Sequence, residues 1–64
     1  MRHKFKVGQM VSAAPKARRT IPTGDYEVIR QLPADAEGFQ YQVKSIRDGH
    51  QRVVHEADLV EVGG

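Results

Sequence analysis

The sequence contains no cysteine and no tryptophan, and its only aromatic residues are two phenylalanines and two tyrosines. Without cysteine there is no disulfide, and the three histidines are too few soft ligands for a structural zinc site. No apolar run approaches the about 18 residues that a membrane-spanning helix needs, and no apolar stretch of signal-peptide length follows the basic amino terminus. We therefore expect a domain of the reducing cytoplasm, held together by packing alone, with no metal, cofactor or membrane partner.

A chain of 64 residues has room for one hydrophobic core, because a domain of this size buries only about 60% of the surface that its unfolded chain exposes. Its hydrophobic share of 39% and its charged share of 28% are typical of a globular protein. The sequence shows no internal repeat, low-complexity tract or linker. It thus predicts a single domain over residues 1–64.

Positive charge is concentrated in the first third of the sequence, although the net charge is only +2. Residues 1–24 hold six basic side chains and no carboxylate, whereas residues 25–64 hold four basic and eight acidic side chains. Such asymmetry indicates a surface for phosphate or for an acidic partner. The two segments would neutralise each other if they packed side by side.

Apolar and polar residues alternate with a period of two in much of the chain, which is typical of half-buried strands. Met10 to Ala14 is predicted as the first strand, and residues 15–24, with two prolines, three basic residues and a glycine, as a long exposed loop. Asp25 to Leu32 is predicted as the second strand, with Ile29 and Arg30 interrupting its pattern. Its inward face is expected to be formed by Tyr26, Val28 and Leu32, and its outward face by Asp25, Glu27 and Gln31.

The middle of the sequence predicts a turn and then a pair of strands. Residues 33–38 contain a proline, two carboxylates and a glycine, so we predict that they form the turn after the second strand. The clearest alternation runs from Phe39 to Ser45, which is predicted as the third strand, with Tyr41 and Val43 facing the core. Asp48-Gly49 then predicts a tight type I′ hairpin that leads into Val53-Val54.

Glu56 to Leu59 has poor β-propensity and is too short for an α-helix, so we predict a single 3₁₀ turn before a last strand at residues 60–62. The predicted order is five strands, with a long first loop and a 3₁₀ turn before the last strand. This order is typical of a small all-β SH3-like barrel. An open meander is the alternative, because a partly closed barrel and a twisted sheet show the same periodicity.

Short motifs at core and turn positions cover most of the chain. They are Phe5-x-x-Gly8-x-x-Val11, Gly24-x-Tyr26-x-Val28 with Leu32-Pro33, Tyr41-x-Val43-Lys44-Ser45, and Arg52-Val53-Val54 with Glu56-x-x-Leu59. This pattern resembles a group of small uncharacterised bacterial proteins with an SH3-like barrel. The resemblance implies that fold, and it implies little about function because its motifs are structural positions.

The strongest candidate for a functional site is a basic cluster on the long first loop. It consists of Lys16, Arg18 and Arg19, with Lys4 and Lys6 as additional members. Such groups can neutralise phosphates, and a loop beside a small barrel is a common place to grip nucleic acid. We therefore interpret the domain as a binding module for nucleic acid or an acidic protein. The alternative is a solvated loop that only keeps the protein soluble.

The four aromatic side chains, Phe5, Tyr26, Phe39 and Tyr41, are all predicted to face the core, because a domain this small can scarcely spare them. Phe39 or Tyr41 is the expected exception, since polar residues flank their strand. If both were exposed, nucleic-acid binding would be favoured, because single strands stack on exposed rings. A polyproline site or a cage for methylated lysine needs a row of exposed rings that this sequence lacks.

No pattern in the sequence predicts catalysis, and we expect neither an enzyme nor a small-molecule substrate. The two serines, Ser12 and Ser45, have no spacing that links them to a histidine base. His55, beside Glu56, is interpreted as a surface hydrogen-bonding group, and the carboxylates near the carboxyl end are expected to be solvated. The alternative to nucleic-acid contact is a protein-interaction or accessory module that uses a sheet edge or an apolar groove.

Overall fold

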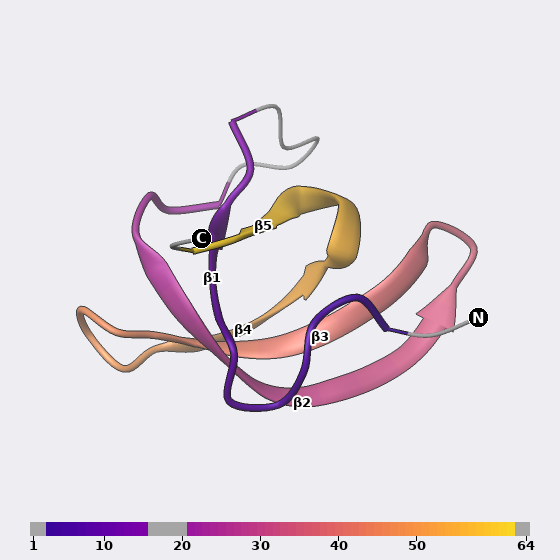
Figure 1. The fold of residues 1–64 in the computed structure, drawn as a ribbon, viewed down its shortest axis with the longest axis horizontal. Helices are drawn as coiled ribbons and strands as arrows, with labels where there is room; N and C mark the ends of the chain where they lie inside the picture. Colours follow the sequence, from indigo (N-terminus) through magenta and orange to yellow (C-terminus); the bar gives the residue numbers. More distant parts are fainter. Residues whose placement is uncertain (1–2, 16–20, 63–64) are drawn as a thin grey trace.

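A computed structural model describes residues 3–15 and 21–62, which form five antiparallel strands in one sheet (Figure 1). The elements in chain order are β1 (Met10–Ala13), β2 (Asp25–Asp35), β3 (Gly38–Ser45), β4 (Gln51–His55), the 3₁₀ helix η1 (Glu56–Asp58) and β5 (Leu59–Glu61). The strand order is β4-β3-β2-β1-β5. The predicted all-β class, the five strands and the single 3₁₀ turn are confirmed.

The two edge strands, β4 and β5, are not paired with each other within the described residues, so the sheet is open and its closure into a barrel is not confirmed. The described part of the chain contains no helix that is both long and apolar enough to cross a bilayer. Figure 1 shows β2 and β3 as a curved pair, with η1 and the segment before β1 on its concave side.

The core lies on this concave side and is built from eight buried apolar side chains. They are Phe5, Val11, Tyr26, Val28, Tyr41, Val43, Val54 and Leu59. Ile21 and Phe39 are half-buried and pack against them. The prediction that Tyr26 and Val43 point inward is therefore confirmed, and the aromatic residues do supply most of the large core side chains.

A register shift between Val28 and Arg30 interrupts the pairing of β2 with β3. An extra residue in one strand exchanges its two faces beyond that point, because side chains alternate with a period of two. Beyond the shift, Gln31 lies opposite the buried Tyr41, and its side-chain Nε2 donates to the Phe5 carbonyl at 2.8 Å. The prediction of an inward Leu32 is therefore wrong, whereas Gln31 is exposed as predicted, although it lies on the same face as Tyr41. The interruption itself was visible in the sequence.

The turn between β2 and β3 is shorter than predicted. β2 continues through Pro33 to Asp35, and only Ala36 and Glu37 form the turn, so the predicted turn over residues 33–38 is wrong. Pro33 falls within a second register shift, between Leu32 and Asp35. A proline is tolerated there because the regular ladder, which needs its missing N–H, is already interrupted.

The predicted hairpin between β3 and β4 is present, but its turn is not type I′. A type I′ turn needs positive φ at both central residues, and within the described residues only glycines have positive φ. Gly49, at φ 75°, is the one left-handed residue of the loop from residue 46 to 50. The Asp48 carboxylate instead accepts the His50 N–H at 3.0 Å, which closes a local side-chain turn.

The segment before β1 is anchored along β2 at the first register shift. Gly8 donates its N–H to the Val28 carbonyl at 2.7 Å, and the Val28 N–H donates to the Gln9 carbonyl at 2.9 Å. Gly8 has φ 88°, which allows the bend that the sequence indicated at this residue. This anchoring places Phe5, fully buried, over the concave face of the sheet.

Candidate interaction surfaces

Of the five predicted binding residues, the structure describes only Lys4 and Lys6, because Lys16, Arg18 and Arg19 lie outside the described residues. Both lysine side chains are exposed, on the segment that precedes β1. The predicted loop follows β1, whereas the two lysines precede that strand.

The acidic end of the chain lies directly beside the basic amino-terminal segment. Glu56 Oε1 accepts the Lys4 backbone N–H at 2.7 Å, and Glu61 Oε1 accepts a hydrogen bond from Gln9 Nε2 at 2.9 Å. Farther along, the Ala14 N–H donates to the Asp58 carbonyl at 2.8 Å. The charge asymmetry of the sequence is therefore reduced in space, because the two oppositely charged segments are neighbours.

Glu56 is the centre of a hydrogen-bonded network rather than a solvated carboxylate. Besides the Lys4 N–H, its Oε1 accepts the Tyr41 hydroxyl at 2.5 Å, and the Tyr41 oxygen in turn accepts the Phe5 N–H at 3.1 Å. Burial and the adjacent Glu56 carboxylate raise the pKa of Tyr41 to about 12, because both disfavour the phenolate. The expectation of solvated carboxylates is wrong for Glu56, which is half-buried, and for Asp58, which is completely buried.

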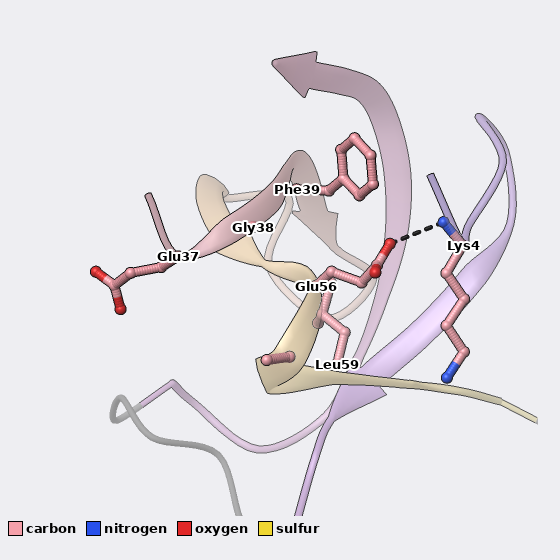
Figure 2. A pocket seen from close by; sticks show the side chains of 7 residues that line it. Lys4, Glu37, Gly38, Phe39, Glu56 and Leu59 are labelled. Atoms are coloured by element: carbon pink, nitrogen blue, oxygen red, sulfur yellow. Dashed lines mark hydrogen bonds between the residues drawn. The ribbon is translucent and has the colours of Figure 1, made fainter. Parts of the chain in front are cut away.

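A half-open groove of about 300 Å³ lies between the segment before β1, the start of β3 and η1 (Figure 2). It is lined by Lys4, Glu37, Gly38, Phe39, Glu56, Ala57 and Leu59. Phe39 is the one aromatic residue that is not fully buried, and the His3 ring covers part of it, with 4.3 Å between the ring centroids. The groove therefore offers a single partly exposed ring, whereas a platform for stacking bases needs several exposed rings in a row.

The Lys4 ammonium does not reach into the network around Glu56. It lies 5.6 Å from the centroid of the Phe5 ring, within the range of a cation–π contact. Figure 2 shows its side chain running away from Phe39, while the Glu37 carboxylate points out of the groove on the opposite side. The charges at the rim are therefore spread out, and they do not converge on one point.

His55 is paired with Asp35, not with its neighbour Glu56. Its Nε2 lies 2.9 Å from Asp35 Oδ2, and its side chain is only 14% exposed, so it is more enclosed than the surface position we expected. The hydrogen bond with His55, together with the Glu37 N–H, lowers the pKa of Asp35, because both favour the ionised carboxylate. The contribution of Asp35 to stability is therefore present above its unfolded pKa of 3.8 and is lost as the pH falls through the lower folded value.

Asp35→Asn is expected to flatten the acid limb of the stability profile, because it removes the carboxylate whose ionisation favours the folded state. Urea unfolding at pH 7 and at pH 3 measures this, and the difference between the two pH values should be smaller in the variant than in the wild type. Asp25→Asn, which removes a carboxylate from the opposite end of β2 without touching His55, is the control. An unchanged acid limb in Asp35→Asn would contradict the assignment.

Ser45 and His50, two of the residues considered as catalytic groups, are engaged in the turn between β3 and β4. The Ser45 hydroxyl accepts the Arg47 N–H at 3.3 Å, and His50 lies 3.5 Å from the Asp48 carboxylate beside the hairpin turn. Across residues 3–15 and 21–62, no three His, Cys, Asp or Glu side chains are placed to hold a metal ion together. These residues therefore supply turn geometry in the structure.

β4 provides an exposed strand edge at the end of the sheet. It pairs with β3 over five consecutive residue pairs, and within the described residues no strand pairs with its other side. Val53, at its centre, is 57% exposed.

No family model, curated protein or solved structure matches this chain, so function is inferred from these surfaces alone.

Proposed function

We propose that this domain is a non-enzymatic binding module that contacts an acidic partner through its basic amino-terminal third. Nucleic acid is the partner that we favour. The observation that carries the proposal is the exposure of Lys4 and Lys6 on a 24-residue stretch without a single carboxylate. The same stretch contains Lys16, Arg18 and Arg19. Ammonium and guanidinium groups bind phosphates and release counterions, which needs no particular fold or pocket.

The contact is expected to be weak, dependent on salt and tolerant of sequence. The six basic side chains of residues 1–24 neutralise at most six phosphates, so log K against log salt should fall no more steeply than about −4.2 on a single strand. Glu56 and Glu61 lie beside the lysines and lower the local positive potential. With one partly exposed ring, Phe39, stacking adds little to affinity.

The double variant Lys4→Gln/Lys6→Gln tests the proposal through its salt dependence. It should weaken binding and make the slope of log K against log salt shallower by about 1.4 on single-stranded DNA or RNA. Fluorescence anisotropy with labelled oligonucleotides between 50 and 200 mM salt measures this. The matched control, Arg30→Gln/Lys44→Gln, removes the same charge from exposed positions on β2 and β3.

Two results would contradict this function. Wild-type protein that binds neither single-stranded nor double-stranded DNA or RNA at 50 mM salt has no such activity. Equal changes in slope for the two double variants would mean that only net charge matters, and that the amino-terminal lysines form no site.

Protein interaction is the second candidate function, and the groove beside Phe39 together with the free edge of β4 favours it. The strand order β4-β3-β2-β1-β5, with a 3₁₀ helix before the last strand, also supports our proposal that the sheet belongs to the SH3-like barrel class. In such a module the lysines would serve solubility, and a partner would bind by main-chain hydrogen bonds or by filling the groove.

A further inference from the structure

The outer edge of β4 carries backbone groups that no described strand satisfies. Ser45 N–H donates to the His50 carbonyl at 2.8 Å, and the pairing of β3 with β4 continues from there without a register shift. Hydrogen-bonded and non-hydrogen-bonded pairs alternate along an antiparallel ladder. The N–H and C=O groups of Gln51, Val53 and His55 are therefore the ones that face away from β3.

This edge lacks most of the features by which edge strands commonly avoid pairing. Proline, charged side chains (lysine above all), a bulge or very short length usually blocks an edge. β4 has the sequence Gln-Arg-Val-Val-His, is regular over five residues and contains no proline, lysine or bulge; Arg52 is its one residue with a formal charge. The opposite edge strand, β5, has only three residues. Val53 lies at the centre of β4, with an isopropyl group that is 57% exposed.

We propose that the β4 edge pairs with β4 of a second copy of this chain, antiparallel and centred on Val53. This goes beyond nucleic-acid binding and gives the sheet-edge alternative a definite partner. A two-fold axis at Val53 places Val53 opposite Val53, Gln51 opposite His55 and Arg52 opposite Val54. All three outward residues of each strand then exchange hydrogen bonds, about six in total, and the two five-stranded sheets join in one continuous sheet.

Charge and register favour a second copy as the occupant. In the register centred on Val53, no side chain with a formal charge lies opposite another of the same sign, and the exposed valine is covered by its equivalent. A slip of two residues toward the hairpin would place Arg52 directly opposite Arg52, which is destabilising. A slip of one residue would place the outward N–H and C=O groups of one strand opposite residues whose backbone groups point toward β3, so they could not form hydrogen bonds. The register centred on Val53 is therefore favoured over both of these slips.

Sedimentation equilibrium from about 10 μM to 1 mM tests the proposal on the full chain. The wild type should show a reversible monomer–dimer equilibrium. Val53→Lys should weaken dimerisation at least tenfold, because it sets two ammonium groups opposite each other at the axis. The matched control is Ile46→Lys, which changes the charge equally at an apolar side chain that is 56% exposed but lies in the β3–β4 loop. It should dimerise as the wild type does.

A second variant and a second measurement keep the test independent of folding. Val53→Pro removes an N–H that faces away from β3, so it should stay folded by circular dichroism and still lose dimerisation. Amide exchange at Val53 should slow as protein concentration rises. A monomeric wild type at 1 mM, a Val53→Lys variant that dimerises normally, or a dimer with unprotected Val53 amides would each overturn the proposal. None of these results bears on the salt dependence of nucleic-acid binding, which is measured separately.

Discussion

Phe5→Ala is expected to remove a large part of the stability of the fold. Phe5 is completely buried, and its ring packs edge-on against Tyr41 with 5.4 Å between the centroids. Truncating a buried phenylalanine to alanine costs about 3–5 kcal/mol. At about 0.05–0.15 kcal/mol per residue, a chain of 64 residues has a total stability of only about 3–10 kcal/mol. The loss is therefore comparable with the whole free energy of unfolding.

Urea unfolding followed by circular dichroism measures this loss. Val7→Ala is the matched control, because Val7 lies two residues away on the same segment and is 63% exposed, so its truncation should change stability by less than about 0.5 kcal/mol. Phe5→Leu should retain much of the stability, since it keeps most of the buried volume. Equal stability of Phe5→Ala and Val7→Ala would show that the amino-terminal segment does not pack on the core.

Tyr41→Phe is expected to destabilise the fold by about 1–3 kcal/mol, although it removes a single oxygen atom. That oxygen accepts the Phe5 N–H and donates to Glu56 Oε1, so its loss leaves a buried backbone donor without this acceptor. Tyr26→Phe is the control. Among the described residues, the Tyr26 hydroxyl donates to the Pro22 carbonyl at 2.7 Å and accepts no hydrogen bond, so its loss should cost about 0.5–1.5 kcal/mol.

The same residue predicts a loss of stability at alkaline pH. The pKa of Tyr41 is about 12 in the folded protein and 10.0 as its ordinary value, mainly because burial disfavours the phenolate. Its contribution is complete below pH 10 and is lost as the pH rises toward 12, because the unfolded chain ionises first. Unfolding at pH 8 and pH 11 should show a smaller difference in Tyr41→Phe than in the wild type. An equal difference would contradict the role of this hydroxyl.

Local patterns predicted those features that depend on local chemistry. The alternation from Phe39 to Ser45 correctly placed Tyr41 and Val43 inside, because a strand with one buried face must bury every second residue. The poor β-propensity of Glu56 to Leu59 correctly predicted the 3₁₀ helix. The Asp48-Gly49 pair predicted a hairpin but the wrong turn, since the dipeptide allows several loop lengths.

Long-range contacts decided the features that sequence reasoning missed. Leu32 lies on the outer face because of the shift between Val28 and Arg30, where the bends at Gly8 and Gln9 take the hydrogen bonds of Val28. Glu56 was expected in solvent, yet its partners Tyr41 and Lys4 lie 15 and 52 residues away in sequence. No local pattern around Glu56 indicates them.

By itself, the sequence determined an all-β chain with one small core, a basic first third and an acidic remainder, because composition and periodicity are properties of neighbouring residues. Only the tertiary structure decided that the acidic end lies against the basic segment, that Glu56 accepts the Tyr41 hydroxyl, and that no described strand pairs with the outer edge of β4. Each of these depends on which distant segments the strand order brings together. The strand order is the one that buries all the apolar core side chains together, and no single segment of the sequence specifies it.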